Sequence, residues 1–212
     1  MPDVFLSMGR KERRQHAEDK YCGTVHCPIH RVCTTCRAKD DFEKEIAKNF
    51  KDDCIVIRGI GLAADPELHL FRANHDYLHW PSTAAAAKQA YEQARIKNPF
   101  KEIDIVQLHD CFTITELLSY EDLGLCRKGE AKDLVHSGVF ELGSELTVNT
   151  DGGLKSFGHP VGASGIRMIY EIYKQMQGKA EPRRLKKIPE VGLAHNIGGA
   201  PFVAVVILHN RI

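Results

Sequence analysis

The sequence predicts a layered α/β domain over most of its length, on three observations. Beyond Asp53, short β-branched runs alternate with longer helix-like segments. Turn-rich stretches containing glycine separate these segments. An apolar content of 43% across 212 residues is enough to build a sizeable hydrophobic core.

The first part of this domain is expected to contain a strand and a helix. Residues 54–58 form a β-branched run, which we expect to be a buried strand ended by Gly59 and Gly61. Ser82 precedes an alanine-rich segment that predicts a helix over 83–94, with Ser82 as its N-cap. Four consecutive alanines in this helix indicate close packing.

The second part places histidines near the ends of predicted strands. A strand is expected over 103–108, with His109 at its end and an apolar helix beginning near Thr113. Such a strand-to-helix junction is where α/β proteins place ligand chemistry. Two further strands, over 191–194 and 201–208, are expected to be joined by a glycine turn with His195 at its head.

A glycine-rich segment over 152–165 follows a turn-rich stretch and leads into an amphipathic helix over 166–176. A phosphate-binding loop is the obvious alternative for such a segment, but neither Gly-Lys-Ser/Thr nor the Gly-x-Gly-x-x-Gly spacing is present. The segment is therefore interpreted as a rigid loop that presents the imidazole of His159 next to Pro160.

Charge and hydropathy argue against nucleic acid and membranes as partners of this chain. Lys and Arg number 29 against 28 Asp and Glu, so no bulk electrostatic attraction favours nucleic acid or an anionic membrane. The first residues lack the apolar run of a signal peptide, and no stretch approaches the 18 or so apolar residues of a membrane span. We therefore expect a cytoplasmic protein whose seven cysteines are mostly free thiols.

Composition divides the chain into an irregular, cysteine-rich segment over 1–42 and the α/β domain over 43–212, which could begin with a short helix over 43–50. The first segment is either a genuine appendage or the product of a truncated or shifted reading of a longer gene. If it is genuine, four cysteines could bind zinc, although their spacing is not that of a standard zinc ribbon: Cys22, Cys27, Cys33 and Cys36. The basic cluster over 10–14 is interpreted as a solvated face or a disordered arm, and not as a nucleic-acid site.

Three separated motifs resemble the C-terminal half of thiolases. Residues 149–165 resemble the thiolase signature around its catalytic histidine. His109-Asp-Cys-Phe112 is similar to a segment that carries Asn in the better-known thiolases and His in the branch of sterol-carrier-protein-type and archaeal enzymes. The run that begins at His195 resembles the place where degradative and biosynthetic thiolases have Cys-x-Gly, with His195 in the place of Cys.

The resemblance implies a fold and a reaction. The fold would be a thiolase-like C-terminal domain, a mixed five-stranded sheet with helices on both faces. The reaction would be that of an acyl-CoA acyltransferase of lipid metabolism, an acetyl-CoA C-acetyltransferase-like condensation or thiolytic cleavage of 3-ketoacyl-CoA. Coenzyme A thioesters would be substrates, and no permanently bound cofactor is implied.

The resemblance also implies roles for individual residues. His159 would deprotonate a cysteine nucleophile, His109 would help to hold the thioester oxygen directly or through water, and His195 would be the second acid–base group. Five further residues would bind substrate: Gly158, Gly162, Ser164, Asn196 and Gly198.

The nucleophile itself is not expected in this chain, because thiolases carry it in the N-terminal half. Cys111 lies in a motif where the similar branch also has Cys without using it as the nucleophile, and Cys54 and Cys126 are interpreted as ordinary buried or half-buried thiols. We expect an N-terminal thiolase half or second subunit to cover exposed apolar surface, in a homodimer or other oligomer. The alternative is a non-catalytic subunit with the same fold.

Overall fold

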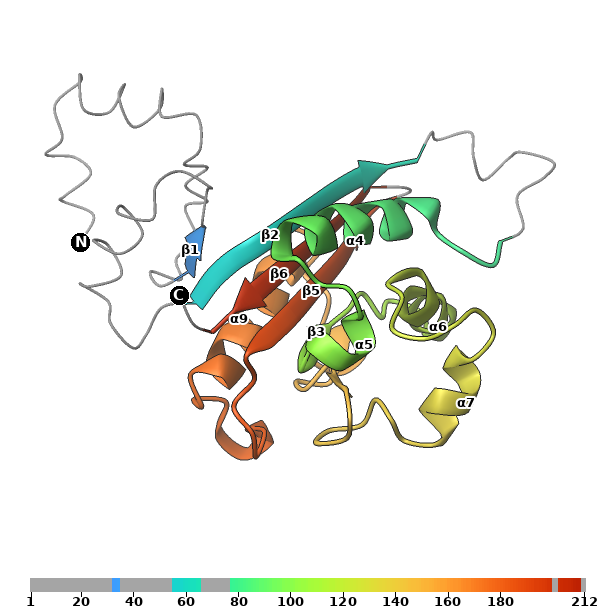
Figure 1. Ribbon diagram of the computed structural model, residues 1–212. Coiled ribbons are helices and arrows are strands. Elements are labelled where there is room, and N and C mark those ends of the chain that lie inside the picture. The colour runs from blue at the N-terminus through green and yellow to red at the C-terminus, as the bar shows by residue number, and fades with distance from the viewer. Residues whose placement is uncertain (1–31, 35–54, 66–76, 200–201, 211–212) are drawn as a thin grey trace, which may run out of the picture.

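A computed structural model of the chain describes residues 32–34 (backbone only), 55–65, 77–199 and 202–210. These residues form one mixed sheet with helices on both faces (Figure 1), which confirms the predicted α/β class. The strands lie in the order β1-β2-β6-β5-β3-β4. Their bounds are Val32–Thr34 (β1), Ile55–Ala64 (β2), Ile105–Gln107 (β3), Thr147–Val148 (β4), Val191–Gly198 (β5) and Phe202–His209 (β6).

Five of these strands come from the predicted domain, and the sixth, β1, comes from within the segment 1–42. The central strand β6 runs antiparallel to both β2 and β5, whereas the pairs β1–β2, β3–β5 and β3–β4 are parallel. Parallel neighbours require crossover connections, and helices lie in the described connections from β3 to β4 and from β4 to β5.

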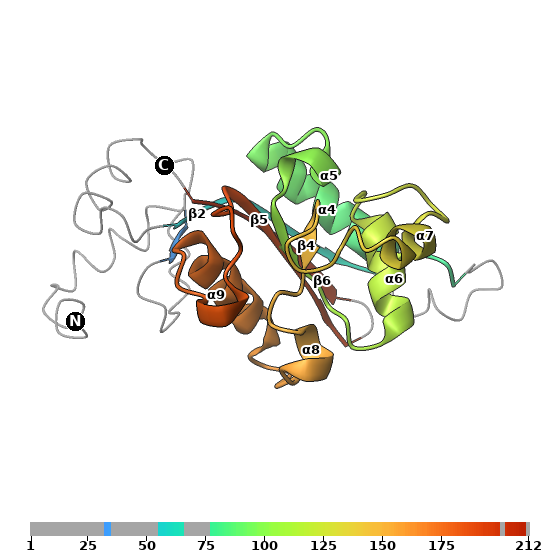
Figure 2. The same cartoon turned by 90° about the horizontal axis from the view of Figure 1, so that it is seen from below.

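The helices α4 and α9 lie on opposite faces of the sheet (Figure 2). Helix α4 packs on β2 and β6, and helix α9 packs on β5 and β3. We call these two sides the α4 face and the α9 face. The helical elements are α4 (Pro81–Ala94), α5 (Pro99–Glu102), α6 (Thr113–Asp122), α7 (Ala131–His136), α8 (Gly153–Ser156), α9 (Ser164–Met176) and the short 3-10 turn η3 (Glu181–Arg183).

Strand β2 continues through the two glycines that were expected to end it. A Cβ atom at Gly59 would lie 2.1 Å from the backbone oxygen of Ala90, and one at Gly61 would lie 1.7 Å from that of Ala86. The glycines therefore allow α4 to approach the sheet, and its alanines complete the contact. The prediction of close packing by the alanines is confirmed, whereas the predicted strand end was wrong.

Helix α4 begins one residue before the predicted N-cap. Pro81 occupies the first turn and Trp80 is the N-cap, so that Ser82 lies inside the helix and is 2% exposed. Proline suits this place because it has no N–H to leave unpaired and its φ is already helical. The prediction of Ser82 as N-cap was therefore wrong.

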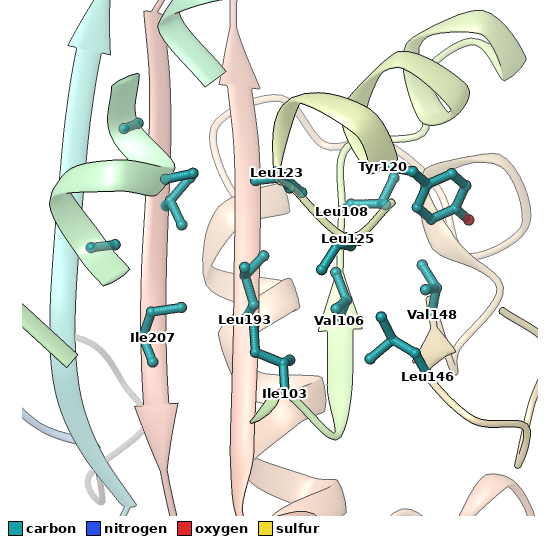
Figure 3. Packing of buried hydrophobic residues seen from close by; sticks show 14 of the residues in the cluster. Ile103, Val106, Leu108, Tyr120, Leu123, Leu125, Leu146, Val148, Leu193 and Ile207 are labelled. Carbon is teal, nitrogen blue, oxygen red and sulfur yellow. The ribbon is translucent and has the colours of Figure 1, made fainter. Parts of the chain in front are cut away.

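Two hydrophobic cores lie on the two faces of the sheet. On the α4 face, Val106, Leu193 and Ile207 project from three neighbouring strands toward residues of α4 and the end of α6 (Figure 3). On the α9 face, Ile105 and Ala194 pack with Met168 and Ile172 of α9. Consecutive residues of one strand thus enter different cores, as the alternation of a β-strand requires.

The last two strands are longer than predicted. β5 continues to Gly198, and its residues pair with β6 as far as Gly198 opposite Phe202. His195 is therefore in the interior of β5, opposite Val205, and not at the head of a turn as expected. This placement decides which face its side chain occupies.

Several expectations fall on other parts of the chain. The short helix over 43–50, Cys22, Cys27, Cys36 and Cys54 lie outside the described residues, and only the backbone of Cys33 is described. Within the described ranges, no helix has the length and apolar character needed to cross a bilayer. Over the same ranges, no group of three or more His, Cys, Asp or Glu side chains is placed to hold a metal ion.

Candidate active site

Two of the predicted histidines lie side by side. His109 follows β3, and His159 lies on the loop between α8 and α9, so that both emerge near the start of α9. Their ring centroids are 5.0 Å apart and the rings meet edge to face at 82°. The structure thus brings together two imidazoles that are far apart in the sequence.

The ring of His109 is held by Asn196 of β5. Its Nδ1–H donates to Oδ1 of Asn196 at 3.0 Å, because a carbonyl oxygen can only accept. In the neutral ring, Nε2 is then an acceptor. Burial lowers the pKa of His109, the hydrogen bond to Asn196 opposes this shift, and the nearby His159 adds to it. Because the pKa falls below its usual 6.5, His109 is neutral at pH 7.

His159 is oriented by the first residue of α9. The hydroxyl of Ser164 donates to the backbone oxygen of Pro160 at 3.1 Å and accepts from Nδ1–H of His159 at 2.7 Å. A hydroxyl has one proton, and the carbonyl takes it, so that the imidazole must be the donor of the second bond. This arrangement leaves Nε2 of His159 with a free lone pair, as a general base requires.

The third predicted histidine lies on the opposite face of the sheet. His195 is fully buried, and its Nε2 lies 3.3 Å from Oγ1 of Thr83 on α4. Its neighbours on β5, Ala194 and Asn196, face α9 and His109 instead. Burial is the main cause that lowers the pKa of His195 to about 3, and the nearby His109 adds to it, so that the ring is neutral over the physiological range.

Asn196 fits the Cys-x-Gly position better than His195 does. Asn196-Ile197-Gly198 has glycine two residues after Asn196, and its side chain reaches the histidine pair. Asn196 was expected to bind substrate; the structure places it as the partner of His109. The alternation of a strand would have indicated this placement, had the end of β5 been known.

The predicted substrate-binding glycines lie where the backbone leaves open space. A Cβ at Gly158, Gly162 or Gly198 would meet no atom within 4 Å, and Gly158 has a φ of +114°. Gly165, which was not singled out, would bring its Cβ to 3.3 Å from Nδ2 of Asn196. Of these four glycines, Gly165 is therefore the one shown to lie against the amide of Asn196.

The described cysteines differ in their surroundings. Cys126 packs against the α4-face core, and burial raises its pKa to about 12, so that it stays protonated near neutrality. Cys111 is half-buried against the α9-face core, and its Sγ lies 3.8 Å from Oγ1 of Thr115. The α9 face is also the face on which Asn196 and His109 meet.

Exposed apolar side chains flank both histidine motifs. Phe112 and Ile114 follow His109, whereas Phe157 and Val161 lie on either side of His159, and all four are more than half exposed. The ring of Phe157 is stacked under the guanidinium of Arg167, which is itself paired with Asp151. The histidine pair is therefore bordered by apolar surface that the described residues leave uncovered.

Comparison with known proteins identifies this arrangement. The family model described as "Thiolase C-terminal domain-like" matches residues 68–211, which is more than half of the chain. The chain belongs to the thiolase C-terminal domain-like family. The resemblance inferred from the three motifs is thereby confirmed.

Curated relatives of this thiolase C-terminal domain include archaeal and animal proteins. The acetyl-CoA acetyltransferase of Methanothermobacter thermautotrophicus is 34% identical over 79% of this chain and 42% of its own length. The benzoylsuccinyl-CoA thiolase subunit BbsB of Thauera aromatica is 42% identical over 55% of this chain and 30% of its own. Human sterol carrier protein 2 is 39% identical over 58% of this chain and 22% of its own length. The chain thus spans less than half the length of these relatives.

Solved structures show the same architecture. The Ltp2–ChsH2(DUF35) aldolase superimposes with a TM-score of 0.67 at 25% identity, over 79% of this chain and 42% of that one. A monomeric SCP2-thiolase-like protein of Mycobacterium smegmatis gives a TM-score of 0.53 at 19% identity, over 79% of this chain and 32% of that one. The second likeness shows the fold alone.

Proposed function

We propose that this thiolase C-terminal domain supplies the acid–base half of an acyl-CoA acyltransferase site, acetyl-CoA acetyltransferase-like, whose cysteine nucleophile belongs to an N-terminal thiolase half. The observation that carries the proposal is the pair of facing imidazoles. Each engages Nδ1 within the protein and leaves Nε2 available. Two adjacent imidazoles suit proton transfer near neutral pH.

In this proposal, His159 performs the first proton transfer. Its Nε2 takes the thiol proton of the companion cysteine, and the thiolate attacks the thioester carbonyl of the acyl-CoA. A tetrahedral oxyanion forms and collapses to an acyl-S-enzyme, expelling the thiolate of coenzyme A, which takes the proton back from His159. The free thiol of coenzyme A then leaves.

His109 stabilises the oxyanion through water. Its neutral ring donates from Nδ1 to Asn196, so that Nε2 accepts one proton of a water molecule. The other proton of that water points to the developing oxyanion. Asn196 thereby fixes both the ring tautomer and its orientation.

The second acid–base group must face the same side of the sheet. His195, expected in this role, bonds Thr83 on the α4 face, and its position favours holding β5 to α4 instead. Cys111 lies on the α9 face, two residues after His109, and we assign it the second proton transfer. In its thiolate form, Cys111 would take the α-proton of the second acyl-CoA, and the resulting carbanion would attack the carbonyl of the acyl-S-enzyme. The tetrahedral intermediate would then collapse and expel the companion cysteine as a thiolate. That thiolate would take the proton from Cys111, which restores the thiolate of Cys111 for the next turnover.

The companion half would cover an apolar surface on the α9 face. Ile60 and Leu62 of β2 alternate with the glycines that contact α4, and they therefore project from the opposite face. Phe202 of β6 lies on that face too, because it pairs with Ala64 of β2. The exposed fractions of the three side chains are 46% for Ile60, 67% for Leu62 and 61% for Phe202. We call these three residues the β2–β6 patch; a second domain would bury it.

The acylation step tests the proposal. The chain would be expressed with a companion half that carries a reactive cysteine, mixed with acetyl-CoA, and the acylated companion measured by mass spectrometry. We expect His159→Asn to slow acylation about 10²–10⁴-fold, as loss of a general base does. His136→Asn, a change on the exposed end of α7, is the matched control. Equal acylation by both variants would refute the proposal.

One other function has specific support. The likeness to the Ltp2–ChsH2(DUF35) aldolase favours carbon–carbon cleavage without an acyl-enzyme, in which His159 would deprotonate a β-hydroxyl group. Blocking the companion cysteine with iodoacetamide would abolish acyl transfer and spare such cleavage. A non-catalytic subunit with the same fold is the remaining alternative hypothesis, and the assembled protein would then lose no activity in His159→Asn.

A further inference from the structure

Asp110 lies between the two histidine-bearing segments. It follows His109 directly, and its side chain is 4% exposed. Its Oδ1 accepts a hydrogen bond of 2.7 Å from the backbone N–H of Leu154, 44 residues further along the chain. A buried carboxylate thus joins the segment after β3 to the glycine-rich segment before His159.

The glycine-rich segment is shaped to receive this carboxylate. Gly153 has a φ of +65°, and a Cβ there would lie 2.2 Å from Oδ2 of Asp110. The carboxylate therefore rests against the Cα atom of Gly153, where a side chain would displace it. This contact explains why glycine is needed at position 153, in addition to its backbone conformation.

A short hydrogen-bonded path leads from this contact to His159. The backbone oxygen of Leu154 accepts from the N–H of Gly158 at 3.2 Å, and Gly158 is the residue before His159. On the other side, Asp110 is adjacent to His109. The segments that carry the two imidazoles are therefore linked by the carboxylate of Asp110 and by the backbone turn from Leu154 to Gly158.

We propose that Asp110 is a positioning residue, whose carboxylate fixes the distance between the His109 and His159 rings by bonding Leu154 and seating against Gly153. Its electrostatic effect on the pKa of His109 is the smallest of the four causes, which favours a geometric role over a direct charge effect. The consequence for catalysis rests on the proposed function. The geometry itself does not depend on it.

The first measurement needs no activity. In the full chain, nuclear Overhauser contacts between the ring protons of His109 and His159 report the 5.0 Å approach of the rings. We expect Asp110→Ala to lose these contacts and Asp110→Asn, which keeps an oxygen acceptor for the Leu154 N–H, to retain them. Intact contacts in Asp110→Ala, or their equal loss in both variants, would overturn the proposal.

A second variant covers the case in which Asp110→Ala does not fold. Gly153→Ala keeps the carboxylate but pushes it away from its seat, and it should also separate the rings. Gly152→Ala is its matched control, because Gly152 has a φ of +90° and a Cβ there would meet the side chain of Ser156 instead. Equal ring contacts in these two glycine variants would count against the role of Asp110.

The kinetic measurement tests the consequence. With a companion half present, Asp110→Ala should lower kcat for acylation about 10–100-fold at nearly unchanged KM, as a misplaced catalytic group does, and Asp110→Asn should restore most of it. An unaltered kcat in an Asp110→Ala protein whose rings have separated would refute the catalytic consequence. If wild-type protein is inactive while the ring contacts behave as expected, the proposed function fails and the positioning role stands.

Discussion

Asn196 accepts a hydrogen bond of 3.0 Å from the ring of His109, although the two residues are 87 positions apart in the chain. The contact exists because β3 and β5 are parallel neighbours, with Gln107 opposite Ala194. Both strands then deliver polar side chains at the same end, as open α/β sheets commonly do around ligand sites. Strand β5 therefore supplies the hydrogen bond that opposes the effect of burial on the pKa of His109.

Replacing Asn196 by Asp should raise the pKa of His109. A carboxylate at the place of the amide would favour the imidazolium, and nearby opposite charges shift pKa values by about 1–3 units. Titration of the ring by NMR measures the shift, with His136→Asn as an assignment control. An unshifted His109 would mean that Asn196 does not contact its ring in solution.

Much of the fold was predictable from local pattern. The β-branched runs, the alanine-rich helix and the helix beginning at Thr113 all follow from spacing that a sequence displays directly. The continuation of β2 through Gly59 and Gly61 could not be predicted in this way. These glycines are needed because α4 packs closely against β2, and the local sequence of the strand does not show that contact. Glycine ends strands in isolation and permits close contact in a packed sheet.

Most residues of the candidate site were predictable from the sequence, but which of them lie together was not. Motif likeness indicated His109, His159 and Asn196. The separation of His195 from this group depends on β5 continuing to Gly198, which is decided by its pairing with β6. A strand that ended at Ala194 would have released His195 into a loop. The pairing register of β5 with β6 therefore decides whether His195 is a candidate acid–base group or a buried histidine.

Replacing His195 by Gln should flatten the dependence of stability on pH. Unfolded chains bind a proton at histidine below about pH 6.5, whereas the folded protein resists protonation of His195 down to about pH 3. The folded state is thus destabilised as the pH falls from 6.5 toward 3, by on the order of 1.4 kcal/mol per pH unit. Above pH 6.5 this contribution to stability is fully present.

Urea denaturation at pH 7.5 and pH 5 measures this effect. His195→Gln should cost about 1–3 kcal/mol at pH 7.5 through its lost contact with Thr83, and a smaller amount at pH 5. His136→Gln, on the exposed end of α7, is the control. An identical loss at both pH values would contradict the buried neutral state of His195.

Replacing Gly61 by Ala should displace α4 from the sheet. The added methyl group would lie 1.7 Å from the backbone oxygen of Ala86, and backbone cannot rotate away as a side chain can. We expect a loss of about 1–3 kcal/mol or more in the free energy of unfolding. Gly162→Ala is the matched control, because a Cβ there meets no atom within 4 Å. Equal stability of the two variants would show that α4 does not pack as described.

Replacing Leu62 by Glu should weaken assembly with a companion half and leave this chain folded. Leu62 is 67% exposed in the β2–β6 patch, so that its replacement changes few contacts within the chain. If a partner buries it, the loss of about 1.5–3 kcal/mol of apolar burial weakens the dissociation constant about 10–100-fold, and the unpaired carboxylate adds to this loss. Lys88→Glu on the exposed side of α4 is the control, because it alters charge away from the patch. Calorimetric titration of the companion half into each variant gives the two constants. Equal binding by both variants would place the companion on a different surface, since a carboxylate on a buried apolar face cannot be neutral in its effect.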